Sequence, residues 1–196
     1  TARNTQPWGG IGGYLEYDVN LSGGSGNDDA SYNASRFGAS RDWDATRYGL
    51  DGTYALPSGW GLSARVRGQH ASEPLISGEQ FGLGGTGSIR GLRDREFAGD
   101  RGYTVTIEAL GPALVDTLQP LLFVDRGAAT LTDIPALGPR QDHAGSIGAG
   151  VRWNWQRKLD ISADLAYVTH GVGDIGTTPG TPSGFVKLHF AAFYRF

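Results

Sequence analysis

Apolar and polar side chains alternate along most of this chain with a period of two residues. Around Glu16, for example, the flanking residues Leu15 and Tyr17 are apolar, and the alternation continues in both directions. A period of two is typical of a β-strand with one apolar and one polar face. The pattern recurs in eight segments, which we predict to be strands: residues 11–21, 47–56, 60–69, 103–109, 118–130, 146–155, 159–167 and 187–196.

The connections between these segments are alternately short and long. The short ones are residues 57–59, 111–117 and 156–158, and the long ones are residues 22–42, 72–100, 131–142 and 171–184. In an up-and-down barrel this order places all short turns at one rim and all long loops at the other. The sequence therefore predicts an all-β fold, a transmembrane antiparallel up-and-down β-barrel of about eight strands, with the whole chain as one domain.

The two faces of the predicted strands differ in charge. One face carries Glu16, Asp18, Arg47, Asp51, Arg65, Arg67, Glu108, Arg152, Asp160, Asp164, Lys187 and Arg195. The other carries aliphatic and aromatic residues, with no charge in the strand centres. Because a charge on a barrel's outer face costs about 2–4 kcal/mol at the bilayer midplane, the apolar face is expected to meet lipid. The alternative is a soluble β-sandwich. Interfacial aromatic girdles would come from Trp8, Tyr48, Trp60, Tyr103, Trp153, Trp155, Tyr167 and Tyr194.

Composition removes several classes of protein. The chain has 17 Lys and Arg against 20 Asp and Glu without a basic stripe, so a nucleic-acid partner is not expected. It has no cysteine, which excludes disulfides, thiolate zinc sites and a cysteine nucleophile. No apolar run approaches the roughly 18 residues of a transmembrane helix, and residues 1–4 lack the features of a signal peptide. We therefore expect an exported protein to be processed or truncated here, and we expect neither a metal nor a cofactor.

Two motifs carry a family resemblance. The first is Ile89-Arg90-Gly91-Leu92, within the glycine-rich stretch 79–103, and the second is Phe123-Val124-Asp125-Arg126-Gly127. They resemble the Val-Arg-Gly-Phe/Tyr loop motif and the Phe-x-Asp-x-Gly strand motif of two-partner-secretion transporters (the TpsB family). That family belongs to the superfamily that includes the barrel-assembly factor BamA. In the loop motif, this chain has other apolar residues at both outer positions.

The resemblance implies that the loop folds back into the barrel interior, where Arg90 meets Asp125 as a gate or anchor pair. A physical reason supports the same pairing. An arginine inside a narrow lumen must find a carboxylate or remain an uncompensated charge, and its planar fork suits a bidentate contact. The glycines that would let the loop bend tightly are Gly84, Gly85, Gly87 and Gly91.

The C-terminus is similar to the recognition signal of outer-membrane proteins, because Tyr194 and the final Phe196 end an alternating apolar strand. The resemblance implies the C-terminal half of a sixteen-stranded family barrel, without the family's periplasmic polypeptide-binding domains. It further implies a bacterial outer-membrane location and secretion of a partner exoprotein. The expected partners are this passenger, the lipid bilayer with its lipopolysaccharide, and the barrel-assembly machinery.

Other functions stay open at this stage. One alternative is a membrane insertase of the BamA type, and another is a minimal or engineered closed barrel without transport. The glycine-rich stretch alone also fits an ordinary surface loop, while a phosphate cradle lacks the Gly-Lys-Ser/Thr that such a loop needs. The histidines, His70, His143, His170 and His189, form no spaced metal-ligand cluster. We therefore expect no enzymatic activity.

Overall fold

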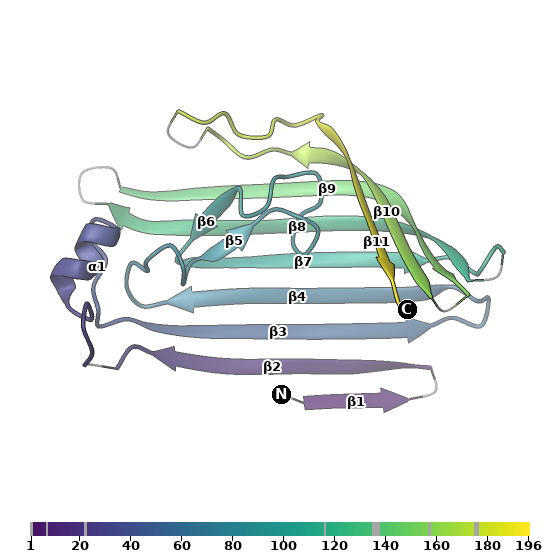
Figure 1. Ribbon diagram of the computed structural model, residues 1–196, viewed down its shortest axis with the longest axis horizontal. Coiled ribbons are helices and arrows are strands. Elements are labelled where there is room, and N and C mark those ends of the chain that lie inside the picture. Colours follow the sequence, from purple (N-terminus) through teal and green to yellow (C-terminus); the bar gives the residue numbers. More distant parts are fainter. Residues whose placement is uncertain are drawn as a thin grey trace.

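The protein folds into one nine-stranded antiparallel sheet with a small second sheet beside it (Figure 1). The structure, a computed structural model, describes residues 2–6, 8–21, 23–115, 117–134, 138–156, 158–174 and 177–196. In spatial order the strands of the large sheet are β1 (Ala2–Gln6), β2 (Gly9–Val19), β3 (Asp44–Ala55), β4 (Gly61–Ala71), β7 (Arg101–Leu110), β8 (Leu118–Ile134), β9 (Gly138–Trp155), β10 (Leu159–His170) and β11 (Val186–Tyr194). Helix α1 (Asp29–Ser35) lies between β2 and β3 in the sequence.

The up-and-down order confirms the predicted all-β antiparallel architecture. Neighbouring strands of the large sheet follow one another in the sequence, except that β4 pairs directly with β7. The two strands between them, β5 (Phe81–Leu83) and β6 (Phe97–Gly99), pair with each other in the small sheet. The sheet has one strand more than the eight predicted, since β1 also joins it. Among the described residues no pairing connects β1 with β11, so the sheet is open and has two free edges.

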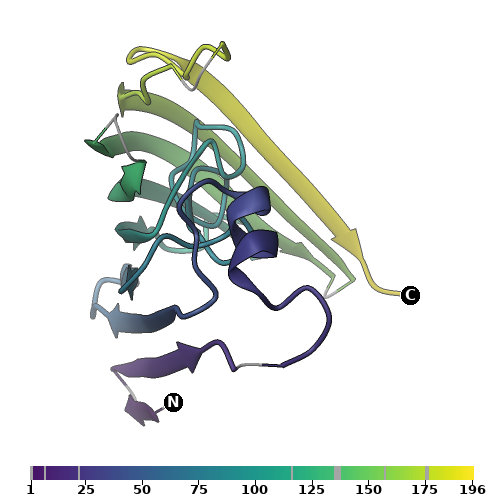
Figure 2. The same cartoon turned by 90° about the vertical axis from the view of Figure 1, so that its left-hand side faces the viewer.

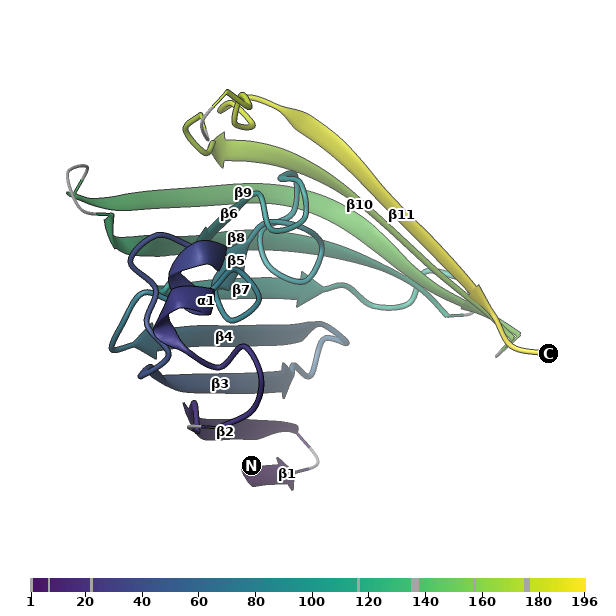
Figure 3. The same ribbon diagram turned by 60° about the vertical axis from the view of Figure 1, so that its left-hand side comes forward.

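The sheet is strongly curved and holds other segments on its concave side. Seen along the strands, it forms an arc, and α1 and the chain around β5 and β6 lie inside that arc (Figure 2). A third view shows β10 and β11 running obliquely across the direction of β2, β3 and β4 (Figure 3). The curvature therefore creates an inner face, covered by loops, and a convex outer face.

The register places the predicted apolar faces together on the outer side. Leu50 pairs with Val66, and Val66 pairs with Val105, so directly opposed residues continue one apolar face from strand to strand. On β8, Val124 is 50% exposed whereas its neighbour Phe123 is 3% exposed, because Phe123 faces the filled inner side. The outer face is thus apolar and exposed, as the alternation predicted.

One charged residue breaks this rule. Arg126 lies on β8 between Val105 of β7 and Gly145 of β9, and its side chain is exposed on the outer face. The prediction of an outer face without charge in the strand centres is therefore wrong at this position. The alternation itself explains the outcome, because Arg126 follows Leu122 and Val124 at the same period of two.

The predicted long loop 131–142 is also wrong. Strand β8 continues to Ile134 and β9 begins at Gly138, so most of the segment belongs to an extended hairpin, and residues 135–137 lie outside the described part. The extension is consistent with the run Thr130-Leu131-Thr132, which is rich in residues that favour strands. The alternation of short and long connections consequently fails at this one hairpin.

The main core lies on the inner side, between the sheet and the chain that it surrounds. Its buried members are Leu83, Ile89, Leu92, Phe97, Ala129, Ala144, Val168 and Val172. Four of them come from the segment between β4 and β7, and the others come from the end of the sheet near the long loops. Burial of these side chains fixes the segment against β8, β9 and β10.

None of the described helical segments combines the length and the apolar character that crossing a lipid bilayer would require.

Candidate functional site

The segment of residues 72–100, here called the returning loop, packs its central motif against the inner face of the sheet. Ile89 and Leu92 are fully buried in the main core. Gly91 has φ of +96°, and a Cβ added to it would lie 2.7 Å from Cγ2 of Val168 on β10. Both the backbone conformation and the close contact therefore require glycine at the centre of the motif.

Between these residues, Arg90 forms a bidentate ion pair with Asp125 of β8. Nε of Arg90 lies 2.7 Å from Oδ2 of Asp125, and Nη2 lies 2.8 Å from Oδ1. The backbone N–H of Arg90 also donates to Oδ2 at 3.1 Å. Arg90 is 3% exposed and Asp125 is 1% exposed. The two residues that the family resemblance pairs are thus in contact, through two side-chain bonds and one backbone bond.

Other carboxylates and an aromatic ring complete the surroundings of Arg90. Its Nη1 donates to Oε1 of Glu108 at 2.7 Å and lies 3.8 Å from Oδ2 of Asp164. The guanidinium carbon lies 3.5 Å from the centre of the Phe123 ring, which is a cation–π contact. Asp164 is also bound by Arg152, at 2.7 Å and 2.9 Å. The buried arginine is therefore part of a charge network, and its Nε, Nη1 and Nη2 each donate to a carboxylate.

Glycines on the strands make room for this arrangement. A Cβ on Gly148 of β9 would lie 2.4 Å from Cζ of Phe123, so the ring occupies the space that a side chain would take. A Cβ on Gly127 would lie 3.2 Å from Cδ1 of Ile89 and 2.6 Å from the carbonyl oxygen of Tyr103. The glycine of the Phe-x-Asp-x-Gly motif thus lets the returning loop approach the sheet closely.

Strand β11 holds the other side of the motif. The N–H of Gly91 donates to Nε2 of His189 at 3.0 Å, and Nζ of Lys187 donates to the carbonyl oxygen of Leu92 at 2.9 Å. The motif consequently bridges the sheet from β7, through Glu108, to β11. The sequence analysis assigned no role to His189, and only the topology brings it to the loop.

A second anchor, around Asp100, was not predicted. This carboxylate is fully buried at the end of the returning loop and accepts hydrogen bonds from Nη2 of Arg36 at 3.0 Å, the N–H of Leu75 at 2.8 Å and the N–H of Thr132 at 2.7 Å. Burial alone would raise the pKa of Asp100, but these donors, Arg36 foremost, lower it below its ordinary value. Asp100 therefore ties the α1 connection, the returning loop and β8 together.

A third contact joins the returning loop to the connection between β10 and β11. Glu96 accepts from the N–H of Arg93 at 2.9 Å and from the N–H of Thr181 at 2.6 Å, and Nη2 of Arg93 lies 2.8 Å from its Oε1. Burial raises the pKa of Glu96, but the bonds from Arg93 and Thr181 outweigh it and lower that pKa. Asp100 and Glu96 lie in the glycine-rich stretch 79–103, but nothing in that stretch assigned either carboxylate a role as a buried anchor.

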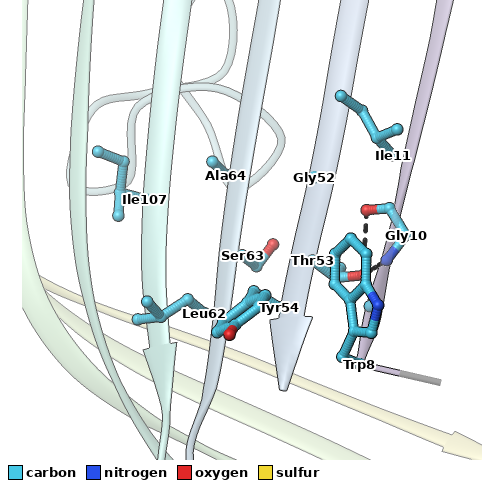
Figure 4. A pocket seen from close by; sticks show the side chains of 11 residues that line it. Trp8, Gly10, Ile11, Gly52, Thr53, Tyr54, Leu62, Ser63, Ala64 and Ile107 are labelled. Carbon is cyan, nitrogen blue, oxygen red and sulfur yellow. Dashed lines mark hydrogen bonds between the residues drawn. The ribbon is translucent and has the colours of Figure 1, made fainter. Parts of the chain in front are cut away.

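The outer face offers a groove, but no reactive groups line it. The groove has a volume of about 760 Å³, and its lining residues include Trp8, Ile11, Tyr54, Leu62 and Ile107 (Figure 4). Thr53 and Ser63 also line the groove, but they alternate with its outer-face residues Gly52, Tyr54, Leu62 and Ala64 and belong to the inner-face row. Within the described part of the chain, no group of three or more His, Cys, Asp or Glu could hold a metal ion. The anchored returning loop is therefore the best candidate for the functional site.

Comparison with known families gives one result that agrees with this geometry. The model of the family described as haemolysin secretion/activation protein ShlB/FhaC/HecB matches residues 12–153, which is more than half of the chain. The chain belongs to this family. The matched range contains both the Arg90 and the Asp125 motif, and it supports the resemblance to TpsB transporters. No curated protein matches the chain.

The predicted C-terminal assembly signal stays a prediction. Tyr194 is the last residue of β11 and is 59% exposed, and Phe196 is fully exposed beyond it. Both side chains are accessible, which a recognition signal requires. The expectation that the protein is not an enzyme is likewise untested.

Proposed function

We propose that this chain forms part of a channel in the bacterial outer membrane through which a partner exoprotein is secreted. Family membership supports a role in secretion. The apolar outer face supports contact with lipid, because charges are expensive there. The charged inner face supports a path for a polypeptide that is lined by charged side chains.

The observation that carries the proposal is the buried Arg90–Asp125 pair, which holds the returning loop on the inner face of the sheet. A polypeptide that follows this face must pass beside the loop or displace it. The pair therefore acts as an anchor that sets the position of the loop, and with it the width of the route. Removing one partner of a buried ion pair leaves an uncompensated charge and costs about 3–5 kcal/mol.

The passenger would be an extended exoprotein. We propose that its folding outside the cell gives the transport its direction, and that the barrel-assembly machinery inserts the protein after recognising Tyr194 and Phe196. The surrounding partner is the lipid bilayer with its outer leaflet of lipopolysaccharide. The family's description, which names secretion and activation, favours this role over an insertase of the BamA type.

The test is secretion and channel conductance in Arg90→Ala and Asp125→Ala variants of the protein that carries this chain. We expect both variants to reach the membrane, to secrete less passenger and to show altered conductance in planar bilayers. Arg65→Ala is the matched control, since Arg65 is half exposed and its partner Asp51 keeps Arg67. Wild-type secretion and conductance in both anchor variants would contradict the proposal.

A further inference from the structure

The cation on the outer face, Arg126, does not stand alone. It pairs in register with Gly145 of β9, and Gly145 pairs with His170 of β10, so one row crosses three strands. His143, two residues before Gly145, places its ring 5.0 Å from the ring of His170. These three residues, Arg126, His143 and His170, form what is here called the basic patch, and all three are exposed.

Gly145 lets the basic patch form a continuous surface. It is buried, and a Cβ added to it would lie 3.2 Å from Oγ1 of Thr169 and 3.3 Å from the carbonyl oxygen of Asp125. Because Gly145 has no side chain, none stands between Arg126 and His170 in this row. The guanidinium and the two imidazoles of the patch can each donate hydrogen bonds.

The basic patch has no counter-charge within the described part of the chain. Arg126 forms no ion pair and no side-chain hydrogen bond to a described residue, unlike the inner-face arginines Arg47, Arg67, Arg90 and Arg152. The nearest carboxylates in sequence are turned to the inner face, where Asp125 binds Arg90 and Asp142 accepts from the N–H of Gly173. An exposed cation that has no partner on an otherwise apolar face needs an anion from outside the protein as its counter-ion.

The surroundings indicate what carries that anion. On the side toward the short turns, the next outer-face row contains Val124 and Ile147, which pair with each other and are 50% and 46% exposed. On the other side lies Tyr103, which pairs with Ala128, the partner of His143. A ligand that covers the basic patch and the adjacent apolar row needs an anionic head group on the patch and apolar chains on Val124 and Ile147.

We propose that the basic patch binds the phosphate group of a phosphorylated glycolipid of the outer leaflet, with its acyl chains lying on the adjacent apolar rows. A planar guanidinium binds phosphate oxygens in a bidentate manner, and such charge-assisted bonds are strong next to lipid. The position fits as well, because His170 is the last residue of β10, directly before the long connection to β11, and Arg126 lies in the same row across β9. The proposal rests on the proposed function only in placing the outer face in the membrane.

The experiment measures binding of bisphosphorylated lipid A to the detergent-purified protein by native mass spectrometry. We expect Arg126→Gln to weaken binding at least about tenfold, because the bidentate charge-assisted contact is lost, and Arg126→Lys to weaken it less. Arg65→Gln removes the same charge from the inner face and should bind as the wild type does. Lipid A without phosphate should bind weakly to all of them.

Two outcomes would overturn the inference. One is equal binding of lipid A by the wild type and Arg126→Gln. The other is full competition by millimolar inorganic phosphate, which would make the lipid chains irrelevant. Failure of this inference is distinguishable from failure of the secretion role. Asp125→Ala should lose secretion and keep lipid A binding, whereas Arg126→Gln should keep secretion and bind lipid A more weakly.

Discussion

At the scale of single residues, the inner face is organised by buried carboxylates that each collect several donors. Asp125 binds Arg90 through side chain and backbone, Asp100 binds Arg36 and two N–H groups, and Glu96 binds Arg93 and Thr181. For Asp100 and Glu96 these donors lower the pKa of the carboxyl group, so protonation of either group weakens its attachment of the loop. These two contacts are consequently linked to pH.

Asp100 permits a prediction about pH. Its folded-state pKa lies below the ordinary value of about 3.9, so its ionised form favours the folded protein. This contribution is fully present above that ordinary value and is lost as the pH falls through the lower folded value. We expect the thermal stability of the wild type to fall more steeply below about pH 4 than that of Asp100→Asn, which should already be less stable at pH 7. Parallel pH profiles of the two proteins would contradict this account.

At the scale of elements, the returning loop depends on backbone conformations that its sequence makes accessible. Gly84, Gly85 and Gly91 all have positive φ angles, as the glycine-rich composition predicted for a tight fold, whereas Gly87 has open space around it. The loop therefore contains glycines that require a positive φ angle and one that has free space for a side chain, and substitutions at Gly91 and Gly87 can be compared directly.

We expect Gly91→Ala to displace the loop and Gly87→Ala to leave it in place. The first variant combines an unfavourable backbone conformation, at about 1–2 kcal/mol, with a contact of 2.7 Å to Val168. Limited proteolysis of the loop and passenger secretion would measure the effect. Equal protease resistance of both variants would show that the loop does not depend on the conformation at Gly91.

The elements also show what the sequence could predict. Period-two alternation located eight strands and their faces, because alternation directly reflects burial on one side only. It missed β1, a short and mainly polar strand from Ala2 to Gln6. It also ended β8 too early, at residue 130, and began β9 too late, at residue 146. The Arg90–Asp125 pair was accessible through its motifs, but Asp100, Glu96 and His189 were not, because tertiary contacts across 20 to 98 residues create their environments.

At the scale of the whole molecule, an open curved sheet separates two chemically different faces. The outer face exposes aliphatic residues such as Ile107 and Leu165, at 52% and 54%, and the inner face holds the charge network and the loops. This is the inverse of a water-soluble sheet, whose apolar side is the buried one. The separation supports the proposal that lipid contacts the outer face and that the passenger polypeptide follows the inner face.

Two adjacent positions on β3 test this separation. Gly52 lies on the outer face with no atom near its missing side chain, and Thr53 lies on the inner face. We expect Gly52→Arg to destabilise the protein in the bilayer by about 2–4 kcal/mol and to lower its amount in the outer membrane. Thr53→Arg should be tolerated. The opposite order of the two variants, measured on membrane fractions, would exclude the proposed orientation of the faces.

The most direct test of the central claim, that Arg90 and Asp125 act together to position the returning loop for polypeptide passage, is a double-mutant cycle read by passenger secretion. We expect Arg90→Ala/Asp125→Ala to secrete no less than the worse single variant, because removing both partners leaves no uncompensated buried charge in the pair. Independent effects, in which the double variant shows the product of the two single losses, would contradict the account.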